Sequence, residues 1–310
     1  MRIGTRGSAL ALAQARWVAE RLQEGGEPVE IVEVVTLGDR GAAVSDKSRW
    51  VSELERALQD GRIDLAVHSA KDVPAELADG YELVAVPPRA DPRDVICGAV
   101  SLGELRRGAR VGTSSLRRAA QLHAVRPDLQ IVRVRGNVDT RLRKLADGEA
   151  DALVLALAGL ERLGRADAAG GTLDRLVPAA GQGALAVEGR PGALSDAQRD
   201  AVNDPVAMAC VAAERELVNA LEAGCETPVG AHCRMQDDGR ASLTGWVGLP
   251  DGAAWLRDEV FGDPVGLGAR CAERMLAAGA AELLEQAAAQ VTVTPDGPVA
   301  AGSAAEGGSR

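Results

Sequence analysis

The residues of this chain best suited to chemistry are arginines at the ends of predicted strands. Five of them either follow a strand or lie on the helix after it: Arg6, Arg117, Arg118, Arg135 and Arg141. A guanidinium group binds a carboxylate or phosphate through two parallel hydrogen bonds. Cations in the first turn of a helix, such as Arg117 and Arg118, oppose the helix dipole unless an anion lies there too. If two predicted lobes face each other, all five side chains point into one cleft, which suits a ligand with several carboxylates.

A carboxylate in residues 68–74 is the second candidate. This turn follows a predicted strand over residues 63–67 and contains the charged pair Lys71 and Asp72. A carboxylate beside a cation stays ionised at neutral pH, so it can stabilise a cationic intermediate or carry a proton. The alternative is an ordinary turn capped by an aspartate. We expect His68 to pack against the fold rather than to catalyse.

One cysteine differs from the other four in its context. Cys225 lies in a loop over residues 224–230, at the end of a predicted helix, whereas three others lie in apolar or helical runs. An accessible thiolate in a loop is a good nucleophile for covalent attachment. Cys225 is therefore the preferred attachment site, and Cys233 is the alternative. No spacing of His or Cys indicates a metal site, and we assign none.

Short strands that alternate with helices must position these residues. From Arg2 to about Pro88, β-type runs alternate with helical periodicity, and Ser8 is the expected N-cap of the first helix. Prolines near position 90 interrupt this pattern, which then resumes until the glycine-rich segment 178–183. Two such crossings predict that the chain returns to its first domain after building the second.

These patterns predict an α/β fold with two periplasmic-binding-protein-like lobes joined by a double crossing, plus a small α+β third domain. Within the third domain we expect a helix over 205–221, antiparallel strands within 231–261 and a closing helix over 268–285. The predicted domains are residues 1–90 and 184–204 for the discontinuous first domain, 91–183 for the second, 205–293 for the third, and 294–310 for a disordered tail.

The net charge argues against one class of partner. The chain carries 35 basic and 45 acidic residues, and the resulting formal charge of −10 repels a polyanion such as duplex DNA. Only six residues are aromatic, too few for stacking platforms that bind single-stranded nucleic acid. Because Lys47, Lys71 and Lys144 are the only lysines, 32 of the 35 cations are arginines. We therefore expect no nucleic-acid partner.

The cysteines and the hydropathy pattern favour one compartment. Five scattered cysteines without a CxxC pair argue against a disulfide framework and fit a reducing cytosol. The first residues lack the apolar core of a secretion signal, and no run of about 18 apolar residues occurs. We therefore expect a cytoplasmic protein without a membrane partner. We also expect a monomer, because no long apolar stripe demands an assembly.

A series of stretches in order along residues 1–290 resembles the hydroxymethylbilane synthase family, also called the porphobilinogen deaminases. Each stretch alone is weakly specific, but the ordered set is highly specific. The stretches are Ile-Gly-Thr-Arg at 3–6 with Ser8, His-Ser-Ala-Lys-Asp-Val-Pro at 68–74, Asp-Pro-Arg-Asp at 91–94, Gly-Thr-Ser-Ser-Leu-Arg-Arg at 112–118, Arg-Gly-Asn-Val-Asp-Thr-Arg-Leu at 135–142, Gly-Gln-Gly-Ala at 181–184, and Gly-Cys at 224–225 with Pro228 and Gly230.

The resemblance implies an enzyme that joins four porphobilinogen molecules head to tail, releases ammonia each time and hydrolyses off linear hydroxymethylbilane. It implies a dipyrromethane cofactor bound as a thioether to Cys225. Asp72 would contact pyrrole N–H groups and stabilise the azafulvenium-type cation formed when ammonia leaves. The implied cofactor-binding residues are Lys71, Asp72, Thr113, Ser115, Arg117, Arg118, Arg135 and Gly136, and the implied substrate-binding residues are Arg6, Ser8, Arg135, Arg141 and Gln182.

The expected lid over the substrate departs from the family pattern. It would include Lys47 and Trp50, although the loop before Lys47 is shorter than in many relatives and Leu37 stands where an arginine is common. Trp50 can replace the aromatic residue that the family places over the substrate. The competing hypothesis for the whole chain is a non-catalytic two-lobed anion-binding module. That module explains the arginine cleft but gives no role to Cys225 or the third domain.

Overall fold

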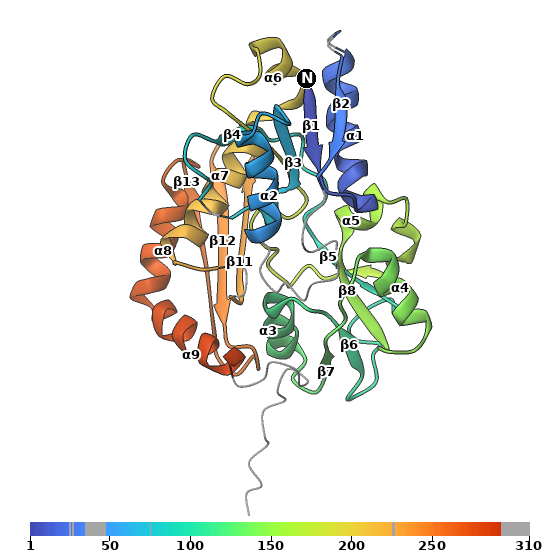
Figure 1. Cartoon of the computed structure of the whole chain (residues 1–310). Helices are drawn as coiled ribbons and strands as arrows, with labels where there is room; N and C mark the ends of the chain where they lie inside the picture. Colours follow the sequence, from blue (N-terminus) through green and yellow to red (C-terminus); the bar gives the residue numbers. More distant parts are fainter. Residues whose placement is uncertain (25, 27, 35–47, 75, 225–226, 293–310) are drawn as a thin grey trace, which may run out of the picture.

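Three sheets organise the part of the chain that the structure describes. The computed structural model describes all residues except 25, 27, 35–47, 75, 225–226 and 293–310. It contains two five-stranded sheets of mixed direction and one three-stranded antiparallel sheet. Figure 1 shows the first lobe above the second, with a third unit beside them.

The first lobe is built on the sheet β2-β1-β3-β10-β4, in which β10 runs antiparallel to its neighbours β3 and β4. Its strands are β1 (Arg2–Thr5), β2 (Glu30–Glu33), β3 (Leu65–Ser69), β4 (Glu82–Ala85) and β10 (Leu185–Gly189). The helices that pack on this sheet are α1 (Ala9–Glu24), α2 (Ser48–Gln59) and α6 (Asp196–Val202). Ile3, Leu65 and Val187 are fully buried in the core between sheet and helices. Apolar residues on β1 and β3 thus hold the strand ends in place.

The second lobe repeats this arrangement in the sheet β7-β6-β8-β5-β9. Its strands are β5 (Asp94–Cys97), β6 (Arg110–Gly112), β7 (Gln130–Val132), β8 (Ala152–Ala156) and β9 (Gly171–Thr172). Its helices are α3 (Leu116–Val125), α4 (Val138–Ala146) and α5 (Leu157–Arg162), followed by the 3₁₀ turn η3 (Ala166–Ala168). Ile96, Val111 and Leu122 belong to its core.

The two crossings deliver equivalent strands to the two lobes. Residues 86–93 lead from β4 into β5, and residues 173–184 lead from β9 back into β10. Both delivered strands are the antiparallel member of their sheet, placed between the third parallel strand and the last strand. Both crossings therefore meet where the lobes face each other.

The third unit packs helices on one antiparallel sheet. Its elements are α7 (Pro205–Ala220), β11 (Val229–Met235), β12 (Ala241–Gly248), β13 (Trp255–Gly262), α8 (Leu267–Ala277) and α9 (Ala280–Thr292). Leu217, Leu243 and Cys271 are completely buried in its core. The prediction of one closing helix over 268–285 is wrong, because α8 and α9 are separated at Gly279, whose φ of +97° cannot continue an α-helix.

The predicted fold class is confirmed: two α/β lobes joined by a double crossing, with a smaller α+β unit. The strand predicted over 63–67 lies two residues later, at Leu65–Ser69. The domain boundaries remain predictions, and β10 in the first sheet agrees with a discontinuous first domain. The predicted tail at 294–310 lies outside the described residues. No helix within the described ranges has both the length and the apolar character to cross a membrane.

Candidate active site

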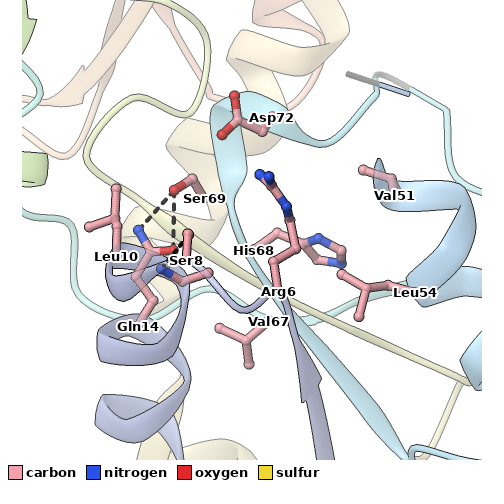
Figure 2. A pocket seen from close by; sticks show the side chains of 11 residues that line it. Arg6, Ser8, Leu10, Gln14, Val51, Leu54, Val67, His68, Ser69 and Asp72 are labelled. Carbon is pink, nitrogen blue, oxygen red and sulfur yellow. Dashed lines mark hydrogen bonds between the residues drawn. The ribbon is translucent and has the colours of Figure 1, made fainter. Parts of the chain in front are cut away.

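An open pocket lies at the carboxyl ends of β1 and β3 in the first lobe (Figure 2). Its empty space is about 490 Å³, including open solvent at its mouth. Figure 2 shows the guanidinium of Arg6 extending toward the carboxylate of Asp72. Neighbouring parallel strands place their following turns at one sheet edge, so these distant residues meet. The polar residues of the lining are Arg6, Ser8, Gln14, His68, Ser69 and Asp72.

Local hydrogen bonds hold the pocket wall. The Ser8 hydroxyl accepts a hydrogen bond from the backbone N–H of Ala11 at 3.2 Å, so the predicted N-cap is confirmed. The Gln14 amide donates to the Ser69 hydroxyl at 2.8 Å and joins α1 to the end of β3. His68 is buried and its Nε2 lies 2.9 Å from Oε2 of Glu188 on β10, which agrees with the packing role expected for this histidine.

Asp72 ends a 3₁₀ turn, η2 (Ala70–Asp72), directly after β3. The backbone N–H of Ala70 donates to the carbonyl of Ala184 at 3.0 Å, which fixes the turn against the second crossing. Gly181 of that crossing has φ of +70°, and a Cβ there would lie 2.8 Å from the Cβ of Ala70. Only glycine permits both this backbone and this close approach. The crossing therefore positions the turn that carries Asp72.

Arg141 on α4 brings a cation from the second lobe. Burial lowers its pKa to about 10, and repulsion from Arg118 adds to that effect, while attraction to Asp72 opposes it. Asp72 and Arg141 are therefore electrostatically coupled across the two lobes. The Nε of Arg141 donates to the carbonyl of Gly136 at 2.7 Å, which orients the guanidinium. A partly desolvated cation of this kind is well placed to receive an anionic group.

Arg117 and Arg118 have a partner that sequence reasoning missed. The Asp94 carboxylate lies 2.8 Å from Nη2 of Arg117 and 2.7 Å from Nη2 of Arg118, and all three side chains are buried. Burial alone would raise the pKa of Asp94, but the two guanidinium groups hold it far below its usual range. Hence the anion that balances the first turn of α3 is a protein carboxylate. Contact of these arginines with a cofactor stays a prediction.

The remaining second-lobe candidates lie at helix starts. Ser115 is the N-cap of α3, and its hydroxyl accepts from the backbone N–H of Arg118 at 3.4 Å. The hydroxyl of buried Thr113 accepts from the backbone N–H of Ser115 at 3.1 Å. Arg135 and Gly136 are exposed in the loop before α4. Arg135 is therefore exposed to solvent, whereas Arg117 and Arg118 are buried.

Gln182 lies in the second crossing and is only 1% exposed. Its Nε2 donates to Asp94 Oδ1 at 2.8 Å and to the carbonyl of Pro92 at 2.7 Å. Its Oε1 accepts from the Lys71 ammonium at 3.2 Å. The side chain thus connects groups of both lobes.

Several predicted residues lie outside the described part of the chain. These are Cys225 and Lys47, together with the side chain of Trp50 in the first turn of α2. The alternative attachment residue, Cys233, is 2% exposed, and its interaction with the Cys210 thiol, together with burial, raises its pKa. A buried thiol with a raised pKa is a poor nucleophile, which strengthens the preference for Cys225. Within the described residues, no group of acidic, His or Cys side chains is arranged to hold a metal ion.

Three further charged residues that contact the crossings or lie in them were missed from sequence. Arg162 on α5 donates to the carbonyl of Gly183 at 2.5 Å, and burial lowers its pKa to about 10. Arg89 of the first crossing pairs with the fully buried Glu214 of α7 at 2.6 Å. A signal for Glu214 was available, because it interrupts the apolar face of α7 that includes Cys210 and Leu217. Its partner could not be identified from the same pattern.

Comparison with known proteins gives a consistent result. Residues 1–197 match the family model "Porphobilinogen deaminase, dipyromethane cofactor binding domain", and residues 208–277 match "Porphobilinogen deaminase, C-terminal domain". The porphobilinogen deaminase of Brevibacillus brevis is 44% identical over 302 residues, which cover 92% of this chain and 96% of the relative. That of Thermus thermophilus is 46% identical over 294 residues, which cover 92% of this chain and 98% of the relative.

The solved structures found by comparison are more distant from this chain. Immunogenic lipoprotein A from Vibrio vulnificus is 13% identical with a TM-score of 0.43, and the match covers 69% of this chain and 99% of that one. The methionine binding protein MetQ is 17% identical with a TM-score of 0.41, covering 65% of this chain and 92% of that one.

The sequence matches carry the assignment: two family models in order, and relatives at 44% and 46% identity over 92% of the chain. The chain belongs to the porphobilinogen deaminase family.

Proposed function

We propose that this protein is a hydroxymethylbilane synthase: it condenses four porphobilinogen molecules head to tail, releases ammonia each time and hydrolyses off the linear tetrapyrrole. The observation that carries the proposal is the Asp72 carboxylate in a pocket with Arg6, electrostatically coupled to Arg141 of the opposite lobe. Porphobilinogen has two carboxylates and becomes cationic when its amine leaves. A site for it needs cations for the carboxylates and an anion for the developing charge, and this pocket offers both.

Asp72 is the proposed catalytic residue. When the carbon–nitrogen bond of the substrate breaks, its electron pair leaves with ammonia and positive charge develops on the methylene carbon and the pyrrole ring. A carboxylate already fixed at the end of η2 stabilises that charge without reorganising solvent. Arg6, Ser8 and Arg141 are the proposed ligands of the substrate carboxylates. They therefore hold the ring while Asp72 faces its reacting carbon.

The second lobe fits an anionic pyrrole cofactor. Arg141 is a partly desolvated cation that Asp72 compensates only in part, so an additional anion is favourable there. We propose that dipyrromethane is attached to Cys225 as a thioether. When bound, dipyrromethane supplies the pyrrole chain to which substrate is added. The proposed residues around its carboxylates are Lys71, Thr113, Ser115, Arg117, Arg118, Arg135 and Gly136, with Asp72 facing the pyrrole N–H groups.

The intact mass of the purified protein tests this proposal. We expect a covalent excess equal to two pyrrole units, which is lost in Cys225→Ser because the thioether sulfur is gone. The matched control is Cys233→Ser, which removes a buried thiol from the same unit and keeps the excess mass. An unmodified wild-type chain that forms no bilane from porphobilinogen refutes the proposal.

A non-catalytic anion-binding module is the competing function. It would use the same arginines but would bind porphobilinogen without releasing ammonia. Matches to two porphobilinogen deaminase models argue against it. Ammonia release that increases with time in the presence of porphobilinogen excludes this alternative.

We further propose a cytoplasmic monomer with a lid that includes Lys47 and Trp50. The described cysteines Cys97, Cys210, Cys233 and Cys271 are buried and free of disulfides, which agrees with a reducing compartment. Among the large apolar side chains exposed on the described surface, Val100 and Val206 lie on separate segments, whereas Trp255 and Phe261 both lie on β13. Size-exclusion chromatography with light scattering tests the monomer, and a mass near 32.0 kDa is expected.

A further inference from the structure

We infer that Gln182 is a positioning residue that couples the turn carrying Asp72 to the arginine-bearing start of α3, in place of the substrate contact expected from sequence. This inference rests on the proposed function. It concerns the alignment of the two lobes rather than a group that touches the substrate.

Each polar group of the Gln182 amide has a partner within the protein. Its N–H groups donate to the carbonyl of Pro92 at 2.7 Å and to Asp94 at 2.8 Å, and its carbonyl accepts from the Lys71 ammonium at 3.2 Å. With 1% of its surface exposed, it has no further face to offer a ligand. A buried amide with all its groups satisfied holds its partners in one arrangement.

The orientation of this amide is fixed by charge. Asp94 is ionised because Arg117 and Arg118 flank it, and a carboxylate can only accept hydrogen bonds. The N–H end of Gln182 must therefore face Asp94, which directs the carbonyl end toward the Lys71 ammonium. The N–H end of the amide thus faces the anionic Asp94 of the second lobe, and its carbonyl end faces the cationic Lys71 of the first lobe.

The main chain of Gln182 is also linked to the third unit through Arg89 of the first crossing. The carbonyl of Gln182 accepts from Nε of Arg89 at 2.9 Å, and the Arg89 guanidinium is paired with Glu214 of α7. Lys71, which donates to the side-chain carbonyl of Gln182, directly precedes Asp72 in the sequence. A shift at Gln182 would consequently move the catalytic carboxylate relative to the groups that hold the cofactor.

The test replaces the amide with an isosteric apolar group, Gln182→Met, in the full-length enzyme. We expect kcat to fall about tenfold to a hundredfold, with KM within about twofold and the cofactor mass retained, because misalignment alone has effects of this size. The matched control is Gln121→Met. Gln121 is also buried, and its amide bonds the main chain of Val177 at 2.7 and 2.9 Å without bridging the lobes. This control should lose similar thermal stability but keep kcat.

A raised KM with unchanged kcat would overturn the inference in favour of direct substrate contact. Equal kcat losses in both variants would overturn it in favour of general packing. If Gln182→Met does not fold, Gln182→Glu decides, because it keeps an oxygen for Lys71 but puts a carboxylate against Asp94. A wild-type kcat in that variant refutes the inference that Gln182 couples the two lobes. A wild-type enzyme without adduct and turnover would instead refute the proposed function.

Discussion

Single residues in this molecule can bind a protein group in addition to the ligand that their type suggests. Arg117 and Arg118 have the fork geometry that suits an external carboxylate, yet both pair with Asp94 inside the lobe. Removing one partner of such a buried cluster leaves an uncompensated charge, so the cluster tolerates little change. Asp72 differs from Asp94 in that it lines an open pocket, where a substrate can reach it.

Asp72→Asn tests the role of that charge. We expect kcat to fall by about 10²–10³, because the neutral amide cannot stabilise a developing cation, while the fold and the covalent adduct are retained. The measurement is steady-state formation of bilane, together with intact mass. Asp64→Asn is the control, since Asp64 is an acidic residue of the same lobe that pairs with Arg2 at 2.7 Å, away from the pocket lining. Turnover of Asp72→Asn near the wild-type rate would show that the carboxylate charge is dispensable.

At the scale of elements, the crossings position the site as much as the strands do. The turn η2 is held by β3 on one side and by the second crossing on the other. The close approach at Gly181 sets the distance between the crossing and this turn. A change at Gly181 is therefore expected to move the turn that carries Asp72.

Gly181→Ala tests whether the second crossing positions Asp72, and Gly192→Ala is the control with a matched backbone conformation. Gly181 and Gly192 have φ of +70° and +77°, but a Cβ at Gly192 would meet no atom within 4 Å. Both alanine variants are expected to lose about 1–2 kcal/mol of unfolding free energy from the left-handed backbone. Gly181→Ala should lose more, and should also lose turnover, because its Cβ displaces Ala70. Denaturant unfolding and turnover of both variants provide the comparison, and equal behaviour contradicts the positioning role.

At the scale of the whole molecule, buried charges join the three units. Glu214 of the third unit accepts hydrogen bonds from Arg89 of the first crossing, Gly181 of the second crossing and Cys233 of β11. Burial alone would raise the pKa of Glu214, but Arg89 and His232 hold it below its usual value. The carboxylate thus fixes the third unit, which contains the proposed attachment cysteine, against both crossings.

Glu214→Gln should lower the free energy of unfolding by about 3–5 kcal/mol at pH 7, because Arg89 is left as an uncompensated, largely buried charge. The folded pKa of Glu214 is depressed, so its contribution is complete above the unfolded value of about 4.3 and is lost as the pH falls through the folded value. The difference between wild type and variant should therefore shrink only below about pH 4. Denaturant titrations across this range measure it.

The control is Asp258→Asn, which breaks the more exposed pair with Arg274 in the same unit. We expect it to cost less than about 1 kcal/mol, since solvent screens that pair. Equal losses in the two variants would mean that the buried carboxylate does not join the units.

The sequence by itself determined the features that depend on neighbouring residues. Alternating strands and helices, the cap at Ser8 and the proline and glycine crossings follow from local backbone preferences, and the ordered motifs identify the family. Residue types alone made Asp72 a candidate for stabilising a cation and Cys225 the preferred attachment site, and the family resemblance then named the substrate and the cofactor. The break at Gly279 was within reach of local reasoning, because glycine commonly ends a helix.

The tertiary structure alone decided which charges face each other. Asp94 neutralises Arg117 and Arg118, Arg141 is coupled to Asp72 of the opposite lobe, and the Gln182 amide lies between two lobes. Periodicity along a chain shows which face of an element is buried, but it does not identify what lies on the other side of that face. Burial then decides the outcome, because a desolvated charge must be matched by a partner and an exposed charge need not be.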